Sequence, residues 1–130
     1  MQATGIDVLV GGSAKWVLFI GLAAFGLAKV LGGHSPQYGM SAWAYYGTAV
    51  AELTLAVALL GRWQAWASWA AVCLFAGGVV FAMVERRHPC GCLGHVVSLA
   101  WRDHLMLAGS FGIIATLAAE HAGRRMRRSA

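Results

Sequence analysis

The residues best suited to chemistry in this chain lie at positions 88–95, HPCGCLGH, where one glycine separates two cysteines. A disulfide between Cys90 and Cys92 would close a very small ring, and the strain in such a ring makes the bond easier to reduce than a structural disulfide. Gly91 permits the tight backbone bend, and Gly94 extends the turn. We therefore predict that the two cysteines form a redox-active pair that exchanges disulfides.

The charges around the pair favour the same chemistry. Arg86 and Arg87 precede the cysteines, and positive charge nearby favours the thiolate, which is the nucleophile in disulfide exchange. A disulfide that only clips the loop would add little stability, because one intervening residue closes almost no chain. The pattern thus indicates exchange rather than a structural role.

A metal site is the alternative for the same segment. Two thiolates and two imidazoles, from Cys90, Cys92, His88 and His95, would suit a soft metal ion. Cys-x-Cys is not the usual spacing of a structural zinc site. A transporter would also need ligands along its path, and Cys73, the remaining cysteine, is read as a small packing residue.

Two ionisable residues, Lys29 and Glu52, fall inside apolar stretches, where charge is expensive and usually faces the protein interior. Tyr45, Thr48 and Glu52 are spaced i, i+3, i+7, which places them on one helix face. Two interpretations stay open: an ion pair that fixes packing, with snorkelling of Lys29 as a variant, or a pocket for a quinone headgroup that accepts electrons from the dithiol.

The other histidines are expected at helix ends as interfacial residues rather than ligands: His34, His104 and His121. The chain has no C-x-x-C-H motif, so no covalently attached haem is expected.

The elements that must position these residues are membrane spans. The chain has 130 residues, 59% hydrophobic and 12% charged, which indicates a single integral membrane domain. Four apolar segments are long enough to cross a bilayer, with Ser41 and Asp103 as caps of the second and fourth. The sequence predicts an all-α bundle of four transmembrane helices at about 14–32, 42–61, 63–84 and 103–119, followed by a basic tail at 120–130. Six glycines would allow close helix approach: Gly21, Gly26, Gly77, Gly78, Gly109 and Gly112.

Basic residues predict the orientation. Lys15, Arg62 and the arginines that follow the last span fall on one side, which the positive-inside rule makes the cytoplasm, together with both termini. The cysteine segment would then lie outside, in an oxidising compartment. The net charge of +5 needs no nucleic acid to explain it, because the basic tail can contact anionic lipid.

The order of these features resembles a known family. A lysine in FGLAKVLGG, a glutamate in GTAVAELTLAVALLGR and the segment RRHPCGCLG are similar to the methylamine utilisation protein MauE, within the broader DoxX-like set of four-helix membrane proteins. The resemblance extends over about residues 15–119. It implies five family positions: Lys29, Glu52, Cys90, Cys92 and Gly94. Leu93 departs from the phenylalanine expected there but keeps the apolar character.

The resemblance also implies a role. MauE-like proteins are associated with maturation of methylamine dehydrogenase, whose small subunit is rich in disulfides, together with a thioredoxin-like partner, MauD. We accordingly expect a multi-pass protein of the bacterial inner membrane that acts in thiol:disulfide exchange. Under the pocket interpretation of Lys29 and Glu52, a membrane quinone would be its electron acceptor. Electron flow in the opposite direction is equally compatible with these residues. Soft-metal binding and a structural role in assembling a membrane complex remain the alternatives.

Overall fold

The computed structural model describes residues 5–86 and 99–129, with side chains from residue 9 to residue 127 outside the gap. The elements are α1 (Gly5–Gly32), the short 3₁₀ helix η1 (Pro36–Tyr38), α2 (Ala42–Leu60), α3 (Gln64–Val84) and α4 (Trp101–Ser129). Each of the four α-helices is long and apolar enough to cross a membrane. The predicted all-α architecture with four spans is confirmed.

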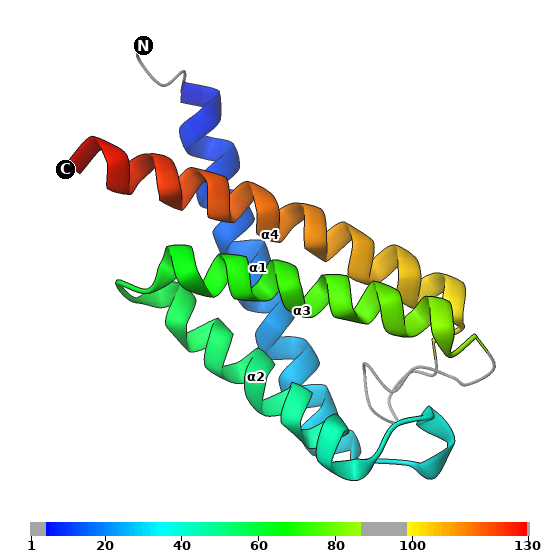
Figure 1. Ribbon diagram of the computed structural model, residues 1–130. Helices are drawn as coiled ribbons and strands as arrows, with labels where there is room; N and C mark the ends of the chain where they lie inside the picture. The colour runs from blue at the N-terminus through cyan, green and yellow to red at the C-terminus, as the bar shows by residue number, and fades with distance from the viewer. Residues whose placement is uncertain (1–4, 87–98, 130) are drawn as a thin grey trace.

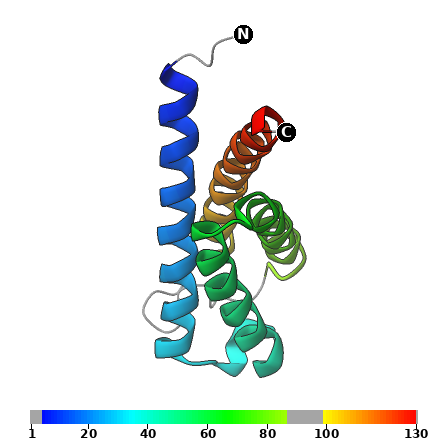
Figure 2. The same cartoon turned by 90° about the vertical axis from the view of Figure 1, so that its left-hand side faces the viewer.

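The four helices form two antiparallel pairs, α1 with α2 and α3 with α4 (Figure 1). Further contacts join α1 to α4 and α2 to α3, so that the helices form a closed ring of neighbours. Helices α2 and α3 diverge from their short connection at residues 61–63, and the two pairs therefore open into a wedge (Figures 1 and 2).

The helix ends follow local capping rules. The Ser41 hydroxyl accepts a hydrogen bond from the Ala44 amide at 3.3 Å, which confirms the expected N-cap of α2. Gly33 ends α1 with a φ of 73°, a conformation that glycine adopts without steric cost. Asp103 lies in the first turn of α4 rather than at its cap, because the helix begins at Trp101.

Two helices extend beyond the spans expected from hydropathy. α1 begins at Gly5, before the expected start near residue 14, and α4 continues through the basic segment to Ser129. In the C-terminal extension Glu120 and Arg124 lie one turn apart with their charged atoms 3.7 Å apart. The added part of α4 is polar and basic, and hydropathy does not report such an extension because it marks only the part of a helix that contacts lipid.

Small residues and three phenylalanines form the core. Leu18, Leu22 and Leu59 are fully buried among alanines from all four helices. The rings of Phe25, Phe75 and Phe111 form a cluster, with centroids 5.1 to 6.4 Å apart. By contrast, many large apolar side chains point outward, as expected for helices that contact lipid.

The predicted close approaches hold for some glycines only. A Cβ at Gly21 would lie 2.1 Å from the Phe111 ring, and one at Gly26 would lie 2.7 Å from Leu53, so both allow close contact with a neighbouring helix. The prediction is wrong for Gly77 and Gly109, where a Cβ would meet nothing within 4 Å. These two glycines face open space rather than a neighbouring helix.

Candidate functional site

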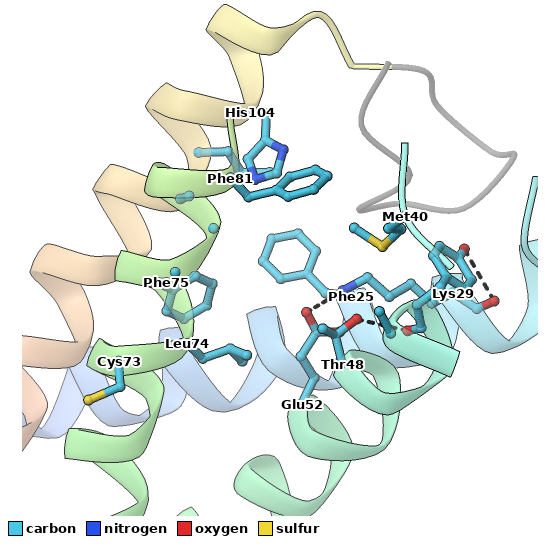
Figure 3. Close-up of a pocket in the computed structure, with 16 residues that line it drawn as sticks. Phe25, Lys29, Met40, Thr48, Glu52, Cys73, Leu74, Phe75, Phe81 and His104 are labelled. Atoms are coloured by element: carbon cyan, nitrogen blue, oxygen red, sulfur yellow. Dashed lines mark hydrogen bonds and ion pairs between the residues drawn. The ribbon is translucent and has the colours of Figure 1, made fainter. Parts of the chain in front are cut away.

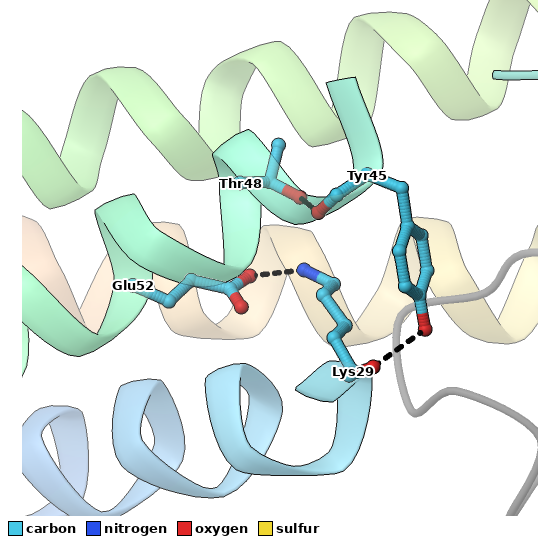
Figure 4. A network of polar contacts seen from close by, with 4 residues as sticks. All are labelled: Lys29, Tyr45, Thr48 and Glu52. Atoms are coloured by element: carbon cyan, nitrogen blue, oxygen red, sulfur yellow. Dashed lines mark hydrogen bonds and ion pairs between the residues drawn. The ribbon is translucent and has the colours of Figure 1, made fainter. Parts of the chain in front are cut away.

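An ion pair joins the first two helices inside the bundle. Lys29, in the last turn of α1, donates from Nζ to Oε1 of Glu52 near the middle of α2, at 2.5 Å (Figure 4). Only 7% of each side chain is exposed. The structure therefore brings the two ionisable residues of the sequence analysis into direct contact, across the interface between α1 and α2.

Two further polar residues, Tyr45 and Thr48, lie on the same face of α2 as Glu52. The Tyr45 hydroxyl donates to the Lys29 carbonyl oxygen at 3.4 Å, and Thr48 donates to the Tyr45 carbonyl oxygen at 2.8 Å (Figure 4). Tyr45 is fully buried and stacks on Tyr38, with ring centroids 5.7 Å apart. The hydrogen bond from Tyr45 holds the end of α1 against the start of α2 and helps to fix the backbone that carries Lys29.

One oxygen of the pair has unused hydrogen-bonding capacity. Glu52 Oε2 is buried and accepts no hydrogen bond from any residue that the structure describes. The Lys29 ammonium has three protons, and its contact with Glu52 uses one of them. A buried acceptor without a partner costs free energy, and more so in a membrane, where water cannot reach it. The pair is thus equipped to bind a further polar group.

That free oxygen belongs to a residue that lines a cavity of about 410 Å³ between the two helix pairs (Figure 3). The walls are mainly apolar, and polar atoms come from a few side chains. The lining residues are Phe25, Lys29, Met40, Ala44, Tyr45, Thr48, Glu52, Cys73, Leu74, Phe75, Gly77, Gly78, Phe81, His104, Leu107 and Ala108. An apolar chamber with few polar groups is the usual form of a small-molecule site.

His104 is the residue that sequence reasoning missed. It was expected at the interface, yet it is buried in the first turns of α4 and lines the cavity wall across from Glu52 (Figure 3). Its Nε2 would lie 3.5 Å from a Cβ placed on Gly78. The helical spacing could have revealed this position. His104 precedes Ala108 by four residues and Ala115 by eleven, which places it on the buried face of α4.

Of the remaining candidates, Arg86 does not line the cavity, Cys73 lies at its margin, and the others lie outside the described residues. Arg86 is exposed, donates from Nε to the Met83 carbonyl oxygen at 3.1 Å and places its guanidinium over the Trp101 ring. Cys73 is exposed at the margin of the cavity, so its expected role as a buried packing residue is wrong (Figure 3). Seven candidates fall outside the described residues: Arg87, His88, Cys90, Gly91, Cys92, Gly94 and His95.

The metal alternative depends on that same undescribed segment. Among residues 5–86 and 99–129, no three histidine, cysteine, aspartate or glutamate side chains gather as a metal site. His88, Cys90, Cys92 and His95 were the ligands considered, and all four lie outside these ranges. The structure therefore leaves the metal alternative untested.

Chain connectivity relates the cavity to the cysteines. Phe81 lies in the last turn of α3 and His104 in the first turns of α4, and both line the cavity. The connection between these two helices carries Cys90 and Cys92. The cavity thus lies near the end of the bundle where this connection leaves α3 and enters α4.

A comparison with protein families gives the affiliation. The model of the family described as methylamine utilisation protein MauE matches residues 8–120, which include every candidate site residue. The chain belongs to the MauE family. With its four spanning helices, this MauE-family chain is a multi-pass membrane protein associated with methylamine utilisation. No curated protein and no solved structure matches the chain significantly.

Proposed function

We propose that this MauE-family chain is a membrane thiol:disulfide redox protein that uses Cys90 and Cys92. The observation that carries the proposal is the cavity containing Lys29 and Glu52, at the end of the bundle where the segment with both cysteines connects α3 to α4. A membrane dithiol oxidase needs at least a cysteine pair and a site for an electron acceptor.

The exchange step balances between the cysteine pair and the dithiol of its partner. A thiolate of the partner attacks one sulfur of the Cys90–Cys92 disulfide and forms a mixed disulfide, and the other cysteine leaves as a thiolate. The second thiol of the partner then resolves the mixed disulfide, so the partner is oxidised and the cysteine pair holds two electrons and two protons. Reoxidation of the pair requires a two-electron acceptor.

The residues of the cavity fit a membrane quinone in that role. Bound there, a quinone would take up the two electrons and two protons of the dithiol. The phenylalanines that line the cavity, Phe25, Phe75 and Phe81, supply apolar walls for a ring. Lys29 offers unused N–H donors, and Glu52 Oε2 offers an unused acceptor. His104, on the opposite wall, supplies an imidazole that can accept and pass on a proton.

The client follows from the family. We propose that the protein resides in the bacterial inner membrane and supports maturation of a disulfide-rich extracytoplasmic enzyme such as methylamine dehydrogenase, together with a thioredoxin-like partner resembling MauD. The family name links the chain to methylamine utilisation, and the cysteine pair supplies the chemistry that such a client requires.

The direct test is the redox state of the cysteines in native membranes. In a Cys73→Ala background, thiols are trapped in acid and counted by maleimide addition before and after reduction. We expect Cys90 and Cys92 to be oxidised and to cycle when a dithiol is added. Thiols that stay reduced and become protected by Zn²⁺ or Cu(I) would replace the redox function with a metal site. A Cys90→Ser/Cys92→Ser variant that still matures the client would indicate a structural assembly role.

A further inference from the structure

The cavity opens toward lipid. Three of its lining residues, Ala44 on α2 with Cys73 and Gly77 on α3, are exposed on the outside of the bundle. Cys73 lies beside the midpoint of α3, which spans Gln64–Val84, and therefore near the middle of the bilayer. The opening lies between the two helices that diverge in Figure 1. A molecule dissolved in the hydrocarbon could enter there without crossing a polar headgroup layer.

Gly77 keeps this opening wide. A Cβ at Gly77 would meet nothing within 4 Å, although the residue lines the cavity. The neighbouring Gly78 instead faces His104 and Ala108 at ordinary contact distances. Gly77 therefore lacks a packing reason to be small, and a side chain at this position would project into the opening.

The ion pair between Lys29 and Glu52 determines which polar group a ligand in the cavity should carry. A ligand beside the ion pair can receive a hydrogen bond from Lys29 Nζ and can donate one to Glu52 Oε2. A hydroxyl does both, whereas a carbonyl only accepts and would leave Oε2 unpaired. Lys29 and Glu52 together carry no net charge, which favours a neutral ligand in this apolar chamber.

We propose that the cavity binds a lipid-soluble hydroquinone that enters from the bilayer between α2 and α3, with its ring among the phenylalanines and its tail leaving past Gly77. One hydroxyl contacts Lys29 and Glu52, and the reduced form binds more tightly than the oxidised form. The choice of a quinone-type ring rests on the proposed function, whereas the route and the preference for a hydroxyl follow from the cavity. Tighter binding of the reduced form would favour electron flow from the dithiol to the ring.

The test measures binding without thiol chemistry. Full-length protein with Cys90→Ser and Cys92→Ser is placed in lipid nanodiscs and photolabelled with a short-tailed phenol that carries a diazirine, because a phenol does not exchange electrons with a quinone or a hydroquinone. A fully substituted short-tailed benzoquinone competes, either oxidised or kept reduced under anaerobic conditions. We expect saturable labelling that the reduced competitor displaces at a concentration about fivefold or more below that of the oxidised one, as satisfying a buried acceptor predicts. Lys29→Met/Glu52→Gln should abolish this difference.

Two matched glycine variants test the route. Gly77→Leu fills the opening, whereas Gly47→Leu adds the same side chain at an exposed α2 glycine that also faces open space but does not line the cavity. We expect Gly77→Leu to weaken displacement about tenfold, the loss of about 1.4 kcal/mol, and Gly47→Leu to change it little. The proposal would be overturned by equal displacement in both variants or by equal binding of the two redox forms to the unsubstituted cavity. Equal competition by an alkyl chain without a ring would also overturn it.

The outcome also separates this inference from the proposed function. If the cysteines never cycle but the labelling can be displaced, the proposed redox function is wrong and the hydroquinone site is supported. Cycling cysteines without displaceable labelling would remove the site and keep the redox function.

Discussion

At the scale of single residues, the Lys29–Glu52 pair combines structure and chemistry. It is buried, it joins two helices, and it leaves one carboxylate oxygen available to the cavity. Removing one partner of a buried pair strands the other charge, whereas replacing both partners by neutral groups is often close to neutral for stability. Stability and turnover therefore respond differently to single and double substitutions.

We expect Glu52→Gln to destabilise the folded protein by about 3–5 kcal/mol, because Lys29 then lies uncompensated in an apolar bundle. Lys29→Met/Glu52→Gln should recover much of this loss and yet lack redox turnover. Thermal unfolding in detergent and dithiol oxidation in membranes measure the two effects. Glu120→Gln is the matched control, because it breaks an exposed pair with Arg124 worth under about 1 kcal/mol. A double variant no more stable than Glu52→Gln would argue against mutual compensation.

His104 makes the second prediction at this scale. His104→Leu places an apolar side chain of similar bulk on the buried face of α4 and removes the imidazole that can carry a proton. We expect dithiol oxidation to slow by about a hundredfold, the usual contribution of a general acid or base, while the folded protein stays abundant. His121→Leu is the control, because His121 packs on Gly11 and does not line the cavity. Equal slowing in both variants would remove His104 from the site.

At the scale of helices, glycines that all lie within apolar helices have different surroundings. Gly21 accommodates the Phe111 ring, which is itself held between Phe25 and Phe75 and has little freedom to move. Gly109, on α4, faces open space. The same substitution should therefore have opposite effects at these two positions.

We expect Gly21→Ala to destabilise the bundle by about 1–3 kcal/mol through overpacking against Phe111. Gly109→Ala should stabilise it by about 0.5–1 kcal/mol, because alanine loses less backbone entropy than glycine in a helix. Thermal unfolding of both variants in the same detergent compares them directly. Destabilisation of similar size at both positions would mean that glycine is needed for helix geometry and not for space.

These helices also show how far sequence reasoning could reach. Hydropathy located the four spans, the Ser41 cap followed from residue type, and the spacing of Tyr45, Thr48 and Glu52 placed them on one face. The contact between Lys29 and Glu52 depends on how α1 is rotated against α2, which local patterns do not specify. His104 stood beside the charged residues Arg102 and Asp103 and therefore resembled an interfacial residue.

The role of Gly77 was equally inaccessible from sequence. Small residues in membrane helices usually mark close helix contacts, and that rule was correct for Gly21 and Gly26. Gly77 faces an opening, and only the divergence of α2 and α3 shows this. The position of each helix along the chain therefore follows from local sequence, whereas the cavity depends on how whole helices are arranged.

At the scale of the whole molecule, the charges differ between the two ends of the bundle. The N-terminal end of α1, the connection between α2 and α3 and the C-terminal end of α4 lie toward one end, as the antiparallel pairs require (Figure 1). The basic C-terminal turn of α4 adds four arginines there: Arg124, Arg125, Arg127 and Arg128. At the opposite end Lys29 is neutralised by Glu52, and Arg86 and Arg102 both lie over the Trp101 ring.

This asymmetry predicts that both termini are cytoplasmic, because basic residues close to span ends are retained on that side. A green fluorescent protein fused after residue 130 should fluoresce, and alkaline phosphatase at the same site should be inactive. Replacing the four arginines by glutamine should raise phosphatase activity in a fraction of molecules, while Glu120→Gln should not. An active phosphatase on the unaltered chain would invert the topology. Cys90 and Cys92 would then face the reducing cytoplasm, where a stable disulfide donor is not expected.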